Sequence, residues 1–175
     1  MQYEVRKSAR ARYMRLSVHQ DGAVVVTVPR IFRGGNIDHF VAMHDAWIQR
    51  ALARVKGKHV IRIARADIKR LKAEALALAK GLSARYAARY GLTYGAISVR
   101  AQKTRWGSCS KKGNLSFNYK IAALPPRLAE YVAVHEVCHL AAFDHSKRFW
   151  DLVAQEVPDH KAQRAALRNI TFIFY

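Results

Sequence analysis

Two histidines with three residues between them, His135 and His139, are the residues whose type and spacing most clearly indicate chemistry. In a helix, side chains four positions apart lie on one face, about one turn from each other. Two imidazoles placed in this way can bind one divalent metal ion, and zinc is the usual occupant. Glu136 follows the first histidine, where its carboxylate can take a proton from a water that the metal activates. The pattern therefore predicts a hydrolytic metal site.

The residues around this pair are mostly apolar, which predicts a buried helix. A buried cluster of imidazoles and a carboxylate is costly unless a partner satisfies it, and a metal ion would do so. The apolar neighbours are Tyr131, Val132, Val134, Val137 and Leu140.

A third ligand is needed, and His145 is the preferred candidate because three histidines leave one coordination position open for chemistry. On one continuous helix, His145 would lie about 9 Å along the axis from His139, too far to share an ion. We therefore expect the helix to end after Leu140 and a second helix to begin near Asp144 or Ser146. The competing third ligands are Asp151, Glu156 and His160.

The chain contains two cysteines, Cys109 and Cys138. Both are expected to be reduced thiols that pack in the interior. Cys138 lies three residues after His135, so a role as a fourth ligand stays open, although it would close the site and make the metal structural.

Elements that could position these residues follow from periodicity. Alternating residues predict three N-terminal strands, and Asp21-Gly22 predicts a hairpin turn between the last two. Two long helices are expected next, from Asn36 to about Lys56 and from Asp67 to Gly91. The three strands are expected at residues 3–8, 12–19 and 23–28.

The second half predicts a sheet followed by helices. Strands are expected at 97–101, 104–110 and 115–118, and the metal-binding helix begins at Pro125-Pro126. A short helix at 159–169 and a terminal strand or packing tail at 171–175 complete the pattern.

The pattern of His135, Glu136 and His139 is similar to that of zincin-like enzymes, and this similarity implies a strand edge beside the metal that holds an extended substrate by backbone pairing. The stretch from Arg105 to Ser108 is the candidate, and Gly107 within it would permit close approach. Arg105 could stabilise developing negative charge. The candidate substrate contacts are Arg105, Trp106, Ser108 and Asn118.

Four stretches resemble the YgjP-like family of zinc metallopeptidases or metal-dependent hydrolases, which is related to SprT-type and WLM-type proteins. They are Thr104–Cys109 (TRWGSC), Gly113–Asn118 (GNLSFN), His135–Leu140 (HEVCHL) and His145–Trp150 (HSKRFW). The resemblance implies one zinc ion held by His135, His139 and His145, with Glu136 as the general base.

The expected fold class is α+β. A zincin-like catalytic domain, with an antiparallel sheet and the metal-binding helix, would span residues 61–175. A small basic β-rich lobe, with a hairpin and a helix, would span residues 1–60, although one continuous domain is an alternative.

The formal net charge is +19 and is unevenly distributed. Residues 1–110 carry 22 Lys and Arg against 6 Asp and Glu, a net charge of +16, whereas residues 111–175 carry 9 against 6, a net charge of +3. Such a charge attracts polyanions, so nucleic acid is a candidate partner of the N-terminal half. No membrane-spanning run or signal-peptide pattern is present, so a cytoplasmic protein is expected.

The sequence thus favours a zinc-dependent hydrolase of metallopeptidase type that acts on a peptide or other acyl bond. One alternative is a metal-dependent nucleotide pyrophosphatase or phosphohydrolase, since a basic protein suits an anionic substrate. The other is a nucleic-acid-associated protease, or a binding module in which the zinc is structural.

Overall fold

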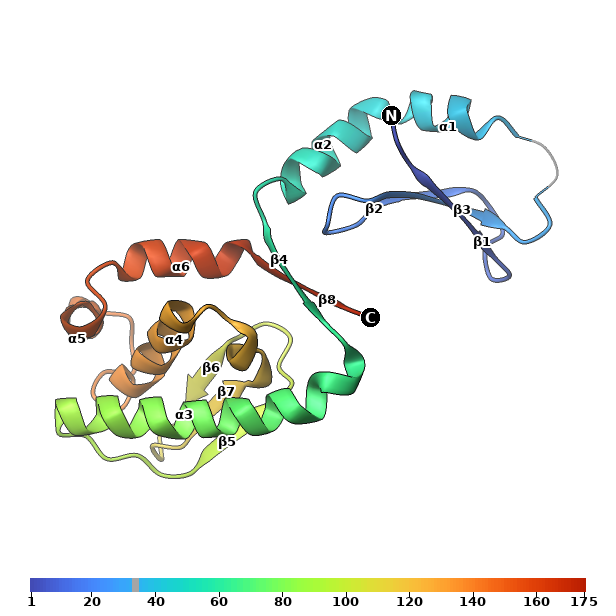
Figure 1. Cartoon of the computed structure of the whole chain (residues 1–175). Coiled ribbons are helices and arrows are strands. Elements are labelled where there is room, and N and C mark those ends of the chain that lie inside the picture. Colours follow the sequence, from blue (N-terminus) through green and yellow to red (C-terminus); the bar gives the residue numbers. More distant parts are fainter. Residues whose placement is uncertain (33–34) are drawn as a thin grey trace. The chain divides into compact units, whose positions relative to one another are not determined.

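The computed structural model of the protein describes residues 1–32 and 35–175. The chain forms two compact units, one made of residues 1–60 and 169–173 and the other of residues 61–168 and 174–175 (Figure 1). Each unit contains helices and strands, which confirms the α+β fold class.

The first unit is built on a three-stranded sheet in the order β1-β3-β2, formed by β1 (Glu4–Ser8), β2 (Arg15–Val18) and β3 (Val24–Pro29). The pair β2 and β3 is antiparallel, as the turn signal predicted, while β1 runs parallel to β3. Because β3 is the central strand, its valines are buried, and Val24, Val26 and Val28 form a core with Val41 and Ile48 of the following helices.

The helix expected from Asn36 to Lys56 is instead two helices, α1 (Ile37–Met43) and α2 (Asp45–Val55). The break lies at His44, whose ring nitrogen Nδ1 is 2.7 Å from the carbonyl oxygen of Phe40. That oxygen would accept the His44 amide in a continuous helix, but the amide bonds to Val41 instead. The side chain therefore replaces a backbone donor and interrupts the helix.

A second sheet pairs β4 (His59–Ile63) with β8 (Ile170–Phe174), so the C-terminal residues form a strand. The sequence did not predict β4, and the division between the two units runs through both strands. A short 3₁₀ turn, η1 (Arg65–Asp67), follows β4.

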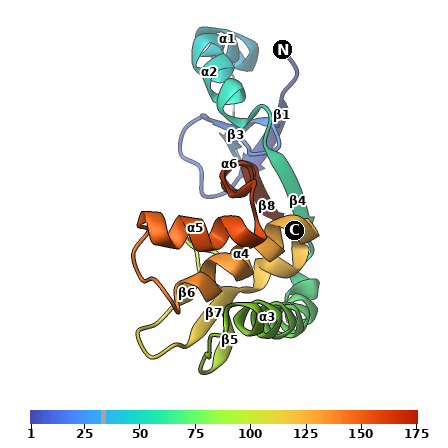
Figure 2. The ribbon, with the colours of Figure 1, turned by 90° about the vertical axis from the view of Figure 1, so that its left-hand side faces the viewer.

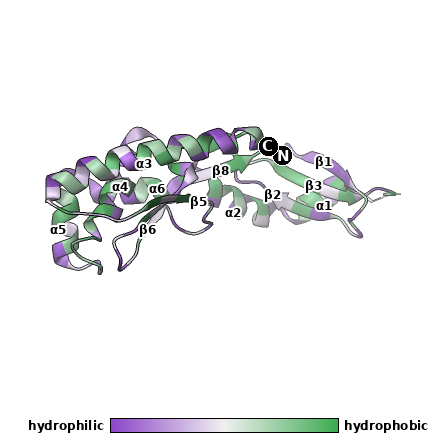
Figure 3. Ribbon diagram, turned by 90° about the horizontal axis from the view of Figure 1, so that it is seen from below, coloured by the Kyte–Doolittle hydropathy of each residue, from purple (hydrophilic) through white to green (hydrophobic). Residues whose placement is uncertain are grey.

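The second unit is organised on the long helix α3 (Ile68–Tyr90), which ends as predicted at Gly91 in the left-handed conformation, with φ of 63°. Figure 2 views α3 nearly end-on, and Figure 3 shows hydrophilic and hydrophobic residues alternating along it. Its buried side packs against η2 (Tyr119–Ala123) and α4 (Pro126–Cys138). Thus α3 supports the helix that carries the predicted metal ligands.

The sheet of this unit has the order β5-β7-β6, with β5 at Ile97–Arg100, β6 at Gly107–Cys109 and β7 at Leu115–Asn118. It is mixed rather than purely antiparallel, since β5 runs parallel to β7 and only β6 is antiparallel to it. A tight turn joins β6 to β7 and makes that pair antiparallel. The expected strand at 104–110 is shorter, so Arg105 and Trp106 lie in the loop that leads into β6.

Two further helices, α5 (Lys147–Glu156) and α6 (His160–Asn169), complete this unit. The edge strand β6 and helix α5 both pack against α4. Within the described residues, no helix combines the length and apolar character required to cross a membrane.

Candidate metal centre

Helix α4 places its last turn in the interior of the second unit. Proline at its first turn starts the helix without losing a needed hydrogen bond, and most of its residues from Leu128 onward are buried. His135 and Glu136 lie near its C-terminal end, and His139 is its C-terminal cap. The helix therefore ends two residues earlier than expected, and the chain turns so that His145 precedes α5.

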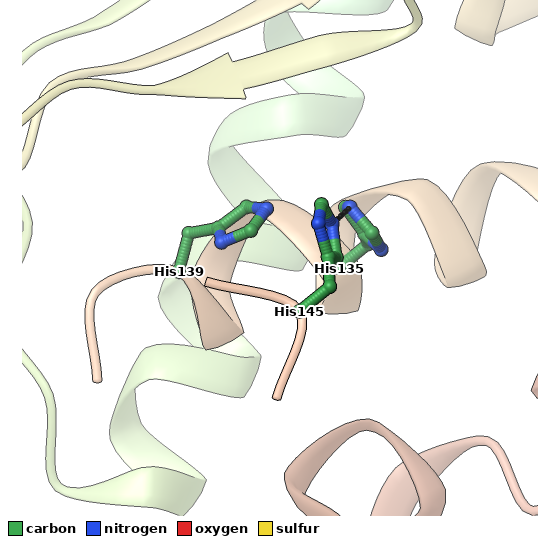
Figure 4. A group of neighbouring side chains, drawn as sticks. All are labelled: His135, His139 and His145. Atoms are coloured by element: carbon green, nitrogen blue, oxygen red, sulfur yellow. Dashed lines mark hydrogen bonds between the residues drawn. The ribbon is translucent and has the colours of Figure 1, made fainter. Parts of the chain in front are cut away.

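The three histidines meet at one point. One ligand nitrogen from each of His135, His139 and His145 lies within 4.8 Å of the other two, and the His139 ring lies edge-on to the other two rings (Figure 4). The Nε2 atoms of His135 and His145 are 3.2 Å apart. Two imidazole nitrogens bound tetrahedrally to one zinc ion are separated by about 3.3 Å, as bond lengths of about 2.05 Å require. The residues present therefore fit a divalent ion.

The hydrogen bonds of the rings support this fit. The Nδ1 atom of His139 is 3.0 Å from the carbonyl oxygen of Ala142, so it carries the proton and leaves the lone pair of Nε2 available. Nδ1 of His135 is buried and has no hydrogen-bond partner within the described residues. The polar requirement of that ring is thus met only on its Nε2 side, where the three rings converge.

Two aromatic residues hold the histidines. Phe149 is fully buried and contacts all three rings, with centroid distances of 4.9 Å to His135, 4.5 Å to His139 and 4.8 Å to His145. Trp150 stacks on His145 at 5.5 Å. These contacts explain why Phe and Trp follow His145 at this spacing, since they supply the surface on which the ligand rings rest.

Burial shifts the pKa values of the side chains in this cluster in the direction that favours their neutral forms. It lowers the pKa of His135 to about 3, with smaller contributions from the neighbouring histidines and Arg164. Burial likewise lowers the pKa of His139, and the hydrogen bond to Ala142 opposes that shift. Neutral imidazoles are the form that binds metal, so both rings are ready to act as ligands near neutral pH.

Glu136 is buried, and burial raises the pKa of its carboxyl group to about 8, against the opposing charge of Arg105. The carboxyl group packs directly on Gly107 of β6. A Cβ atom at Gly107 would lie only 2.7 Å from Oε1 of Glu136. The close approach expected at Gly107 is thus made by this carboxyl group, which the sheet edge and α4 hold together.

The alternative ligands lie outside the cluster, because within the described residues only the three histidines form a group able to hold a metal. Asp151 pairs with Lys147, Glu156 pairs with Arg89, and His160 stacks on Trp150. Cys138 is fully buried, while Cys109 is partly exposed.

A cleft of about 300 Å³ opens beside His135 and Glu136. It is bounded by α4, α6 and the loop that enters β6. Arg105 and Trp106, both predicted as substrate contacts, line it. The full lining is Arg105, Trp106, Gly107, Tyr131, Val132, His135, Glu136, Arg164, Leu167 and Arg168.

Ser108 and Asn118 do not line this cleft. Asn118 is buried, and its amide nitrogen donates to the carbonyl oxygens of Gln102 and Arg105 at 2.7 and 3.1 Å. Its side-chain oxygen accepts from the Lys120 amide. Asn118 therefore fixes the loop that carries Arg105 toward the cleft.

The sequence did not indicate Arg164, Leu167 and Arg168 as site residues. They belong to α6 and are spaced three and four positions apart, so they share one helical face. The spacing is visible in the sequence, but a basic helix face is usually solvated, and only the packing of α6 shows that this face borders the cleft.

Replacing Trp150 with Ala should weaken metal binding by about 10–100-fold, the usual effect of removing a residue that orients a ligand. His145 is exposed and lies in a loop, so the stacked indole is a principal restraint on its ring. Zinc titration with a competing chelator would measure the change. Trp47→Ala is the matched control, since Trp47 is 42% exposed in α2. Equal affinities in both variants would contradict this role for Trp150.

Two crystal structures of archaeal metallopeptidase zymogens are similar to part of the chain. Abylysin of Pyrococcus abyssi is 22% identical, with a TM-score of 0.48, and the match covers 51% of this chain and 90% of that one. Jannalysin of Methanocaldococcus jannaschii is 17% identical, with a TM-score of 0.44, over 51% and 91% of the two chains. No curated protein matches the sequence.

The segment of the chain that matches a protein family includes the candidate metal site. The profile described as "YgjP-like, metallopeptidase domain" matches residues 62–170. This span is more than half of the 175 residues and contains α3, the mixed sheet, α4 and the three histidines. The chain therefore belongs to the YgjP-like family, and its second unit is the metallopeptidase domain of that family.

Proposed function

We propose that this chain is a zinc-dependent hydrolase that cleaves a peptide or other acyl bond, with one zinc ion held by His135, His139 and His145. The observation that carries the proposal is the convergence of three imidazole nitrogens, within 4.8 Å of one another, next to a buried carboxyl group. Structural zinc sites use four protein ligands, whereas three leave a position for chemistry. The family assignment supports the same reading.

When bound, zinc would supply a Lewis acid that polarises the scissile carbonyl and acidifies water. The chain supplies the proton transfer and the positioning. Glu136 accepts a proton from the attacking water and returns it to the leaving group. The positive charge of Arg105 favours the ionised carboxylate, which is the form that accepts a proton. Gly107 keeps space for this carboxyl group, and the adjacent cleft holds the substrate.

Removal of metal should abolish hydrolysis and its return should restore it. A substrate screen of unstructured proteins, peptides and nucleoside triphosphates would first be run with zinc-loaded protein. The active reaction would then be repeated after dialysis against a chelator, and again after adding back one equivalent of zinc. Zinc should also raise the unfolding temperature, because it binds the folded state. Full activity in protein that has been verified to be metal-free would contradict the proposal of a zinc-dependent hydrolase.

Hydrolysis of a nucleoside triphosphate is the second candidate. The observation that favours it is the presence of three arginines, Arg105, Arg164 and Arg168, in the lining of the cleft. Guanidinium groups recognise phosphate through paired hydrogen bonds. Release of pyrophosphate or phosphate in the same screen, without peptide cleavage, would favour this candidate.

A further inference from the structure

Helix α6 presents two arginines to the cleft on either side of an apolar residue. Arg164 and Arg168 are four residues apart and Leu167 lies between them, and all three line the cleft beside His135 and Glu136. Arg105 lines the same cleft from the loop before β6. Three arginines and a single acidic residue, Glu136, thus line this cleft.

These three arginines differ from others in the same unit. Arg127 bonds to Asp159 at 2.9 Å, and Arg89 pairs with Glu156. Within the described residues, neither Arg105, Arg164 nor Arg168 has a carboxylate within ion-pair distance. Their hydrogen-bond donors are therefore available to a ligand that enters the cleft.

Arg164 is also held in place. Its guanidinium lies over the indole ring of Trp150, 5.5 Å from the centroid, which is a cation–π contact. The Trp150 ring also stacks on the rings of His145 and His160. Trp150 therefore links the position of Arg164 to the position of a metal ligand. A fixed guanidinium loses less freedom on binding an anion than a mobile one does.

Both arginines of α6 act on the interior of the cleft. Tyr131 lies on the α4 side, and the positive charges of Arg164 and Arg168 oppose the rise that burial causes in its pKa. The positive charge of Arg164 also contributes to the lowered pKa of His135. The positive charges of these arginines therefore act on residues that line the cleft.

We propose that Arg164 and Arg168 form a subsite that holds an anionic group of the substrate, a carboxylate or a phosphate, beside the bond that is cleaved. Planar guanidinium groups can bind either oxyanion through two parallel hydrogen bonds. Leu167 offers an apolar contact to the part of the substrate that carries the charge. The assignment of this anion to a substrate rests on the proposed function. Binding of an anion at the subsite can be measured without turnover.

The experiment measures binding by calorimetry, with two probes, to the full-length zinc-loaded protein at about 0.15 M salt, where general attraction to the basic surface is screened. The probes are N-acetyl-glutamate and inorganic phosphate, which separate a carboxylate source from a phosphate source. Native protein is compared with the double variant Arg164→Gln/Arg168→Gln. The control is Arg148→Gln/Lys161→Gln, which removes two positive charges from α5 and α6 but not from the cleft lining.

The double variant should bind the preferred probe about tenfold or more weakly, the effect expected when charge-assisted hydrogen bonds are lost. The control variant should bind as the native protein does, and circular dichroism should show that both variants are folded. If the native protein binds neither probe, or if the double variant binds as tightly as the control, the subsite is overturned. Loss of binding in a protein that proves to have no hydrolytic activity would retain the subsite while rejecting the proposed function.

If a substrate is found, the same variants give a second readout. Peptides that differ only by Glu or Gln next to the scissile bond should show a preference for Glu in the native enzyme, expressed as kcat/KM. That preference should disappear in the double variant and persist in the control. An equal preference in both variants would contradict a role for Arg164 and Arg168 in selecting the charge.

Discussion

Glu136→Gln should keep its metal and lose about 10²–10⁴-fold in turnover, the range expected when a general base is removed. Gln has nearly the same shape as Glu, so it can occupy the space beside Gly107 without moving β6 or α4. Its amide cannot accept a proton from water, however. The three histidines are unchanged, so the loss should be in kcat, while zinc affinity stays close to that of the native protein.

The measurement is turnover of the substrate identified in the screen, together with zinc content by elemental analysis. Glu74→Gln is the matched control, because Glu74 lies on α3, pairs with Arg70 and is far in sequence from the site. It should show native turnover. If Glu136→Gln retains both its metal and native activity, Glu136 is not the proton acceptor. Loss of metal in this variant would instead indicate a structural role for the carboxyl group.

The part of the fold that follows from local chemistry could be predicted from the sequence. Gly91 ends α3 because a residue without a side chain adopts the left-handed conformation at low cost. The hairpin at Asp21-Gly22 and the start of α4 at Pro126 have equally local causes. In each case the deciding interaction lies within a few residues, so a short sequence pattern contains it.

The features that the sequence did not predict depend on contacts between distant residues or on competition between two local bonds. Strand β4 exists because it pairs with β8, more than 100 residues later in the chain. The break at His44 depends on whether a ring or an amide bonds to the carbonyl of Phe40. Apolar periodicity predicts a continuous helix there, because it does not describe that competition.

The candidate site shows the same division. The spacing of His135 and His139 defines one face of a helix, and geometry alone required a turn before His145 could join them. The structure brings His145 to the pair through the loop before α5. The roles of Trp150 beneath His145 and of Asn118 behind the Arg105 loop were not predicted, because both depend on side-chain packing between separate elements.

The basic composition predicts that the protein attracts anions, but it does not predict where on the protein an anion binds. Most of the excess positive charge lies in residues 1–110, which directs attention to the N-terminal half. Two of the three arginines in the cleft come from α6, in the part of the chain where the charge is nearly balanced. A net charge is a sum over the sequence, whereas recognition depends on which few charges face the same space.

Gly107→Ala should lower turnover by about 10²-fold or more, the effect of a misplacement of about 1 Å at a reacting group. An added Cβ would lie 2.6 Å from Cγ and 2.7 Å from Cδ of Glu136, so the carboxyl group must move. Because the atoms that move belong to the end of a side chain, the cost in folding free energy should be smaller than the cost in activity. Zinc affinity should change little, since the three atoms nearest to the added methyl group all belong to Glu136 and none to a ligand ring.

Gly81→Ala makes the same chemical change in α3, where nothing lies within 4 Å of the added Cβ. It should leave turnover unchanged and stabilise the protein by about 0.5–1 kcal/mol, because alanine favours the helix. Turnover, zinc content and thermal unfolding would be measured for both variants. Native turnover in Gly107→Ala would show that the position of the Glu136 carboxyl group does not matter for the reaction. A loss of activity that tracks a loss of folded protein would assign Gly107 a purely structural role. The expected combination, a folded and zinc-loaded but slow enzyme, can arise only if the sheet edge sets the position of the base.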